Sequence, residues 1–228
     1  MASENLLSTR ELPLFPLPVV LFPGTLLPLH IFEERYKLMI KQCLEGDKMF
    51  GVTYHTERDG WPPGVGRIGA IAQIMAVVPL EDGRMNILTV GSTRYRTARY
   101  VELEPYLKAE VELFQDDSDG RNMKRLMSEV KGLYERASAA LKELNEEQLP
   151  ELPESPEEFS FAVASSLRLK DEKKQRLLEL RSTTGRLSRL RKYLLAIIEQ
   201  YELRAEIHSR ARRNGHGPLA ALKNLKEE

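Results

Sequence analysis

The spacing of hydrophobic residues changes near residue 117, and the two halves of the chain predict different kinds of structure. Up to residue 116, short hydrophobic runs with a period of two alternate with proline, glycine and aspartate, which is the pattern of β-strands. Extended segments are expected within residues 11–32 and at 49–55, 67–80, 85–90, 93–101 and 106–114. About six short strands predict a small β-barrel-like unit, closed or half-closed.

One helix is expected to interrupt these strands. From about residue 32 to 45, hydrophobic residues recur at the spacing of one helical face, at Phe32, Tyr36, Met39, Ile40 and Cys43. Gly46 is a natural end for this helix, and Glu33 and Glu34 favour its start through the helix dipole. Because Cys43 lies on the hydrophobic stripe, it is predicted to be a buried small side chain rather than a reactive thiol.

Two details of the β region make further predictions. Residues 67–80 are hydrophobic at both alternating sets of positions, which suits a strand buried on both faces. Asp82 and Gly83 then predict a hairpin turn, because both tolerate positive φ. Gly91, which interrupts the next hydrophobic run, indicates a bulge or a corner.

The second half of the chain has helical periodicity. A long amphipathic helix is expected from Met123 to Leu144, and a short one follows the cap at Ser155 and Pro156. A third is expected from Asp171 to Leu180, and a last one, capped by Ser182 or Thr184, runs to about residue 213. The expected fold class is α+β, with a β domain (10–117), a helical bundle ending in a long helix (118–213) and a loose tail (214–228).

Composition narrows the class of protein. Lys+Arg and Asp+Glu both number 34, so no whole-protein positive field is available to attract nucleic acid. The single cysteine excludes an internal disulfide and a multi-thiolate zinc site, and it fits a reducing compartment. The uncharged stretch 12–29 contains five prolines, which argues against a membrane span, and Glu4 and Glu11 argue against a signal peptide. The protein is therefore expected to be cytoplasmic.

Several ordered blocks of this sequence resemble the substrate-binding N-terminal domain of Lon proteases, especially its stand-alone bacterial members. The first block comprises residues 12–17, 20–24 and 27–36 (LPLFPL, VLFPG and LPLHIFEERY), and the second is the Gly-x-x-Gly-containing segment 65–74. Asp82-Gly83-Arg84, Gly91 and Arg94-Tyr95-Arg96 follow, and residues 156–159 and 174–179 fall where the family has its helical bundle. The resemblance covers roughly residues 10–205.

This resemblance implies a PUA-like β pseudobarrel followed by a helical bundle, distantly related to the β domain of cereblon. It also implies a non-catalytic role in recognising polypeptides, associated with proteolysis and protein quality control. The sequence departs from full Lon proteases because it has no Gly-x-x-x-x-Gly-Lys-Ser/Thr phosphate loop and no counterpart of the Ser–Lys peptidase dyad. The chain is therefore expected not to be an enzyme.

Motifs that would support chemistry are weak. Gly64, Gly66 and Gly69 match the dinucleotide fingerprint, but a proline-rich loop precedes them and a strand follows, so the segment is interpreted as a turn. The four histidines show no metal-binding spacing, and His30 is interpreted as a structural hydrogen-bonding residue. No catalytic, cofactor-binding or metal-binding residue is predicted, and no cofactor is expected.

Hydrophobic side chains on irregular segments are the candidates for binding a polypeptide. These are Phe22, Pro23, Tyr54, Trp61 and Pro62, since aromatic groups supply a large contact area at modest entropic cost. For Trp61, pinning its own loop is an equal alternative. The expected partners are unfolded or partner polypeptides, including a protease complex, with the chain itself a monomer or a weak homodimer. The alternative is RNA binding through the β domain and a basic helix end formed by Arg204, Arg210, Arg212 and Arg213.

Overall fold

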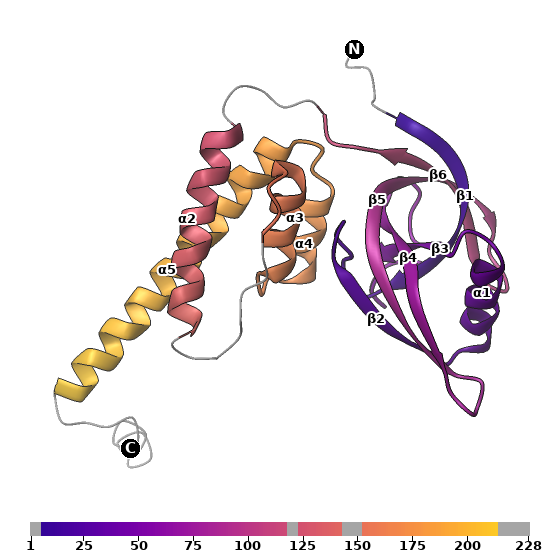
Figure 1. Cartoon of the computed structure of the whole chain (residues 1–228), viewed down its shortest axis with the longest axis horizontal. Coiled ribbons are helices and arrows are strands. Elements are labelled where there is room, and N and C mark those ends of the chain that lie inside the picture. Colours follow the sequence, from indigo (N-terminus) through magenta and orange to yellow (C-terminus); the bar gives the residue numbers. More distant parts are fainter. Residues whose placement is uncertain (1–5, 118–122, 143–151, 214–228) are drawn as a thin grey trace.

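The computed structural model describes residues 6–117, 123–142 and 152–213. It is a mixed α+β structure with six strands and five helices, in which a β unit lies beside a group of four helices (Figure 1). The elements of the β unit are β1 (Leu6–Leu17), β2 (Leu26–Ile31), α1 (Glu34–Glu45), β3 (Met49–Tyr54), β4 (Ile68–Pro79), β5 (Met85–Glu102) and β6 (Leu107–Phe114). The helices that follow are α2 (Met123–Lys142), α3 (Pro156–Ser166), α4 (Asp171–Leu178) and α5 (Thr183–Arg213).

Five of the strands pair in a ring. The sheet order is β2-β5-β4-β3-β1-β6, and an additional pairing of β5 with β6 joins the two sides. The 18-residue β5 makes this possible, because its first part pairs with β2 and β4 while its second part pairs with β4 and β6. Among the described strands β2 pairs only with β5, so it forms an edge outside the ring.

The hairpin predicted at Asp82 and Gly83 and the bulge predicted at Gly91 are present, although of the two turn residues only Gly83 has a positive φ. The Gly83 N–H donates to the Leu80 carbonyl across the β4–β5 turn, and Gly83 has a φ of +77°. The register of β4 against β5 shifts between the pairs Ala70↔Arg94 and Ala72↔Gly91, so a bulge lies beside Gly91. Residues 85–102 form one continuous strand rather than two, because the bulge bends the strand without ending its pairing.

Burial along β4 differs from the prediction. Residues 69–72 are buried, as expected for a strand covered on both faces, but Met75, Ala76 and Val78 are exposed. The reason is that β4 passes from the closed ring to the part of the sheet where β2 is the edge, and only one face is covered there. The prediction that the whole strand is buried on both faces is therefore wrong for its second half.

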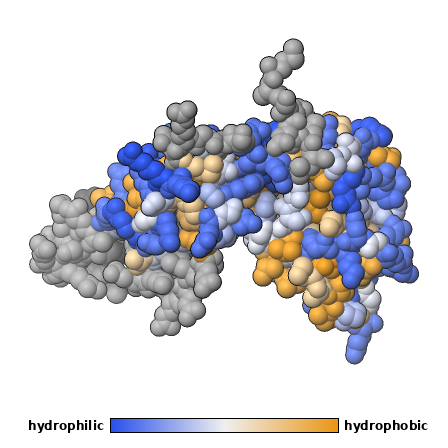
Figure 2. All heavy atoms as spheres, turned by 45° about the horizontal axis from the view of Figure 1, so that its top comes forward, coloured by the Kyte–Doolittle hydropathy of each residue, from blue (hydrophilic) through white to orange (hydrophobic). Residues whose placement is uncertain are grey.

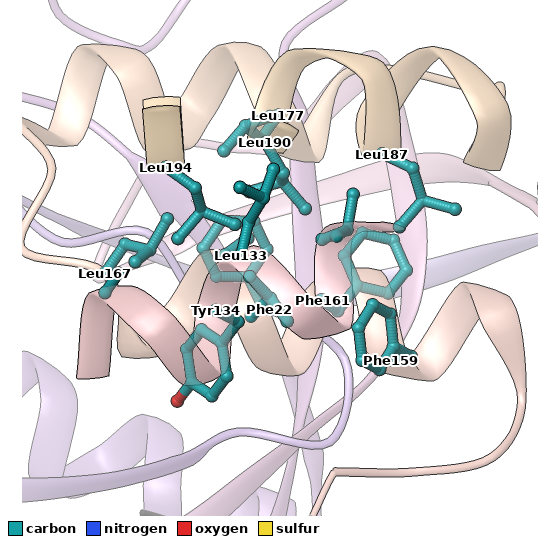
Figure 3. Packing of buried hydrophobic residues seen from close by; sticks show 14 of the residues in the cluster. Phe22, Leu133, Tyr134, Phe159, Phe161, Leu167, Leu177, Leu187, Leu190 and Leu194 are labelled. Carbon is teal, nitrogen blue, oxygen red and sulfur yellow. The ribbon is translucent and has the colours of Figure 1, made fainter. Parts of the chain in front are cut away.

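Hydrophobic residues gather in three clusters. In the first, α1 covers β-strand residues with Tyr36, Met39, Ile40 and Cys43. A second cluster lies around Tyr95, whose hydroxyl is hydrogen-bonded to Thr53 Oγ1 at 2.7 Å. The third holds the helices together and contains Tyr134, Phe159, Phe161 and leucines from α4 and α5 (Figure 3).

The third cluster also includes a residue of the β unit. Phe22, in the segment between β1 and β2, is 1% exposed and lies among the helical side chains, with its ring centroid 6.0 Å from that of Phe161 (Figure 3). Polar contacts join the same units, because Arg94 of β5 donates to the carbonyls of Leu178 and Leu180 at 2.8 and 2.6 Å. The β unit and the helices are therefore packed against each other.

Local sequence explains the ends of the helices. Ser182 Oγ accepts a hydrogen bond from the Gly185 N–H at 2.9 Å, which makes Ser182 rather than Thr184 the residue that caps α5. Pro156 lies in the first turn of α3, as expected. None of the described helices is both long and hydrophobic enough to span a membrane.

Candidate functional site

Three neighbouring strands expose one face of the sheet to solvent. In one row across the strands, Pro28 of β2 lies opposite Leu88 of β5, which lies opposite Ala76 of β4. In the next row the corresponding residues are His30, Asn86 and Val78. Residues that are directly opposite in an antiparallel ladder point to the same side of the sheet, so these six side chains share one face.

This face is strongly hydrophobic. We call it the apolar sheet face and define it by Leu26, Pro28, Met75, Ala76, Val78 and Leu88, all of which are exposed. Met75, Leu26 and Val78 are 61%, 59% and 57% exposed, whereas their neighbours in sequence Leu27 and Ile74 pack into the core. Figure 2 shows hydrophobic residues gathered on the lower part of the β unit. A contiguous set of exposed hydrophobic side chains on a soluble domain usually marks an interaction surface.

His30 lies at the border of the apolar sheet face and contacts two neighbouring side chains. Its Nδ1 atom lies 2.7 Å from Asn86 Oδ1, which confirms that His30 makes a hydrogen bond within the sheet. Its ring stacks near Phe32, with centroids 6.0 Å apart, and Phe32 is 59% exposed. Phe32 therefore extends the hydrophobic surface beyond the end of β2.

The edge strand beside this face is poorly suited to pairing with another strand. Pro28 lies in the middle of β2 and has no N–H to donate, and a proline within a sheet is tolerated where its nitrogen faces away from the ladder. A missing donor at an edge is one of the ways in which proteins discourage strand addition. A partner is therefore expected to contact the side chains of the face rather than the backbone of β2.

A second exposed hydrophobic group lies on the loop between β3 and β4. Trp61 is 54% exposed, and its ring makes an edge contact with His55 at a centroid distance of 5.6 Å. The Arg35 guanidinium lies 5.9 Å from the Trp61 ring and 4.7 Å from the Tyr36 ring. These contacts hold Trp61 in place and leave about half of it open, so loop pinning and exposure occur together.

The five predicted peptide-binding residues do not form one surface. Phe22 and Tyr54 are only 1% and 8% exposed, so the exposure that was assumed for them is wrong. Phe22 follows a proline-rich segment that turns inward onto the helices, which the sequence pattern does not reveal. Pro23 and Pro62 are half-buried, and Trp61, at 54%, is the most exposed of the five.

The arginines of the RNA-binding alternative cannot be placed in the same way. The backbone of residues 204–213 belongs to α5, but the side chains of Arg204, Arg210, Arg212 and Arg213 lie outside the described residues. Their role remains a prediction.

The described residues contain little that could perform covalent chemistry. Cys43 is 5% exposed, and burial raises the pKa of its thiol to about 12, so the thiol is protonated and unreactive at neutral pH. Within residues 6–117, 123–142 and 152–213, no three His, Cys, Asp or Glu side chains come together in a way that could hold a metal ion. Gly66 lies in a turn before β4 with a φ of +87°, and no helix begins there to receive a phosphate.

Comparison with known proteins identifies the family to which this fold belongs. Residues 11–196 match the family model described as "ATP-dependent protease La (LON) substrate-binding domain". The chain belongs to this family. The resemblance drawn from the sequence blocks is thereby confirmed.

Relatives of the Lon substrate-binding family match the chain over most of its length. Lon protease of Trichlorobacter lovleyi is 30% identical over 220 residues, which cover 93% of this chain but 27% of that protein. Lon protease of Cytophaga hutchinsonii is 27% identical over 213 residues, covering 87% of this chain and 26% of that protein. The chain thus spans about a quarter of the length of these relatives and matches only their N-terminal part.

Solved structures of Lon N-terminal domains share the fold. A Lon N-terminal domain protein from Xanthomonas campestris aligns with a TM-score of 0.59 at 26% identity, covering 79% of this chain and 96% of that chain. The N-terminal domain of Mycobacterium avium complex Lon protease aligns with a TM-score of 0.62 at 18% identity, covering 81% of this chain and 98% of that chain. The second likeness supports the fold alone.

The sequence did not predict the apolar sheet face of this Lon substrate-binding domain. The run 74–79 has hydrophobic residues at both alternating sets of positions, which is also the pattern of a fully buried strand. Residues of the neighbouring strands could have indicated that this face is exposed, because Pro28 is typical of an edge strand and Asn86 of a solvated face.

Proposed function

We propose that this chain is a non-catalytic module that recognises protein substrates, and that its principal contact surface is the apolar sheet face. The single observation that carries the proposal is a substrate-binding family match over residues 11–196 in a chain that exposes a contiguous hydrophobic face. The finer parts of the proposal are a PUA-like pseudobarrel for the β unit, an adaptor-like role beside a protease and a cytoplasmic location.

The physical chemistry of the face suits unfolded or partly folded polypeptides. Such segments expose leucine, valine and aromatic side chains, and burying these groups against Leu26, Val78 and Leu88 removes hydrophobic area from water on both sides. The hydrophobic effect has little directional preference, so many sequences can bind. Because Pro28 discourages strand pairing, binding is expected to be weak and reversible rather than a permanent extension of the sheet.

Trp61, with Pro62 beside it, is proposed as a second contact. Its ring is 54% exposed and is held by Arg35 and His55, so little conformational entropy is lost when a partner covers it. Pro23 remains a candidate of lower contact area because it is half-buried.

Charged substitutions on the apolar sheet face test the proposal. The double variant Val78→Glu/Leu88→Glu is expected to bind reduced, carboxymethylated α-lactalbumin about tenfold more weakly, since two hydrophobic contacts are each lost at about 1 kcal/mol or less. Fluorescence anisotropy of labelled α-lactalbumin, titrated with the chain, measures the affinity. A matched control, Val101→Glu/Leu103→Glu, changes side chains that are 40% and 50% exposed, near the end of β5 and just beyond it.

The control variant shows whether binding depends on the apolar sheet face or on exposed hydrophobic side chains in general. Wild-type affinity in the control and a loss in the Val78/Leu88 variant support the proposal. Equal losses in both variants, or no binding by the wild type, would overturn it. The adaptor-like part is tested separately, by asking whether the chain changes the rate at which a purified Lon protease degrades the same client.

A further inference from the structure

A pocket of about 280 Å³ lies where the β unit meets α4. The β unit contributes Tyr54 at the end of β3 together with Asp59 and Arg67 from the loop that carries Trp61. The helix contributes Glu172, Gln175 and Arg176, and Glu179 follows directly at its C-terminal cap, all at the spacing of one helical face. A pocket of this size is below the usual range for drug-sized ligands, and it suits a single long side chain.

Part of the charge in this pocket is already neutralised. Arg67 donates to Asp59 at 2.7 Å, and the Thr56 backbone N–H and hydroxyl both donate to the same carboxylate at 2.9 Å. These hydrogen bonds from Thr56, followed by the one from Arg67, lower the pKa of Asp59 to about 2. Asp59 and Arg67 therefore form a fixed ion pair that shapes the wall and leaves little charge for a ligand.

The remaining polar groups are mostly acceptors. Glu179 receives one hydrogen bond from Gln175 Nε2 at 2.9 Å, and Gln175, only 5% exposed, keeps its own Oε1 atom without a donor among the described residues. Tyr54 is 8% exposed and contributes its phenol to the lining. Glu172 and Arg176 complete the lining. Two carboxylates, an amide oxygen and a phenol thus surround one guanidinium.

We propose that this pocket receives a basic side chain, arginine or lysine, of a bound polypeptide. The lining has one more carboxylate than guanidinium groups, and Gln175 Oε1 is an acceptor without a donor among the described residues. A guanidinium or ammonium group supplies donors and positive charge together, which gives hydrogen bonds stronger than those between neutral groups. An anionic side chain would meet the carboxylates of Glu172 and Glu179 and only one guanidinium, Arg176, outside the Asp59–Arg67 ion pair.

The position of the pocket links it to the proposed polypeptide contacts. The loop that supplies Asp59 and Arg67 also exposes Trp61 and Val65, which are 54% and 64% exposed. A polypeptide that covers these hydrophobic groups would carry its neighbouring side chains toward the pocket. The inference rests on the proposed function and adds a preference for basic residues to it.

Pairs of end-blocked peptides test the preference. An octapeptide with one arginine among leucine and serine residues is compared with the same peptide carrying citrulline, and a lysine peptide is compared with its acetyl-lysine form. Isothermal titration of the full chain is expected to show about tenfold tighter binding of at least one basic peptide than of its neutral partner, since a hydrogen bond to a charged group contributes about 1.5 kcal/mol or more. The preference should shrink between 0.05 and 0.5 M salt.

Variants of the exposed lining carboxylates locate the effect. Glu172→Gln/Glu179→Gln should abolish the preference while leaving neutral-peptide binding unchanged, and the matched control Glu158→Gln/Glu199→Gln, on α3 and α5, should keep it. Far-UV circular dichroism checks that both variants fold. Equal affinity for basic and neutral peptides, or an unchanged preference in the pocket variant, overturns the inference and leaves the proposed function intact. Failure of every peptide to bind, together with failure of the wild type to bind α-lactalbumin, overturns the proposed function as well.

Discussion

At the scale of single residues, one carboxylate holds two buried arginines. Asp116 accepts hydrogen bonds from Arg94, Arg186 and Thr183, and the contact with Arg186 Nη2 measures 2.6 Å. Arg94 and Arg186 are 2% and 0% exposed, and Arg186 also lies 3.8 Å from the centre of the Phe161 ring. Burying charged groups is costly unless they are paired and hydrogen-bonded, so this cluster depends on Asp116.

Replacing that carboxylate should destabilise the protein strongly. Asp116→Asn removes the carboxylate that contacts both buried guanidiniums and leaves Arg94 only Glu157, at 3.9 Å, so the free energy of unfolding is expected to fall by about 3–5 kcal/mol. Urea titration followed by circular dichroism measures it. Asp117→Asn is the control, because the Asp117 side chain is 55% exposed and its ion pair with Arg181 should contribute less than about 1 kcal/mol. A loss in Asp116→Asn no larger than in the control would contradict this account.

The same carboxylate should govern stability in acid. Burial alone would raise the pKa of Asp116, but the hydrogen bond and charge of Arg186 and the charge of Arg94 outweigh it and lower the pKa. A lowered folded-state pKa means that the stabilisation is present above the unfolded-state value of about 4 and is lost as pH falls through the folded-state pKa. Wild-type protein should therefore lose stability more steeply than Asp116→Asn below about pH 4.

The sequence did not predict that Arg94 and Arg186 are buried and paired with Asp116. Arg94 stands in an alternating Arg-Tyr-Arg segment that is equally typical of a strand with solvated charges. Its burial depends on Asp116 and Arg186, which are far away in sequence and meet it only after the helices pack. The burial of Cys43 was predictable because the hydrophobic repeat of α1 places it on the buried face of that helix.

At the scale of elements, close approach of backbones explains one glycine. A Cβ atom on Gly91 would overlap the Phe22 carbonyl oxygen and lie 3.1 Å from Leu21 Cγ. Gly91→Ala is expected to push the Phe22 backbone away from β5, to disturb the packing of Phe22 and to cost about 1–3 kcal/mol of stability. Gly132→Ala is the opposite case, because the exposed Gly132 of α2 has open space around it, so the substitution should stabilise by about 0.5–1 kcal/mol. Thermal unfolding of both variants checks the two signs, and a stable Gly91→Ala variant would contradict the packing argument.

The elements themselves followed from local patterns far better than the surfaces they expose. Period-two runs and turn residues located the regions of the strands, although residues 11–32 were not divided into β1 and β2 and residues 85–102 were expected as two segments, and the helix starts were located within a few residues. The apolar sheet face was missed because burial of β4 depends on which strands lie beside it, and hydrophobic residues at 74–79 are compatible with either outcome. The pocket at α4 was also missed, because it joins residues of two separate units.

At the scale of the whole molecule, the units depend on each other although a division near residue 117 was predicted. That division remains a prediction, but contacts between described residues on its two sides cross it. Phe22 lies in the helical cluster, Arg94 donates to two carbonyls of the helical part, and Gln175 Nε2 donates to the Ile68 carbonyl at 2.9 Å. Separation would expose Phe22 and leave Arg94 without these acceptors.

Unfolding of the two units is therefore expected to be cooperative. Trp61 is the chain's single tryptophan and reports on the β unit, while circular dichroism at 222 nm reports mainly on the helices. The two signals should give the same midpoint in urea. If one unit unfolded first, Phe22 and Arg94 would lose their contacts with the other unit, and that loss disfavours a state in which only one unit is folded. Phe22→Ala should lower both midpoints together, by about 3 kcal/mol in stability, since a large side chain is lost from a packed core. Two separated transitions in the wild type would show that the contacts around Phe22 and Arg94 are too weak to couple the units.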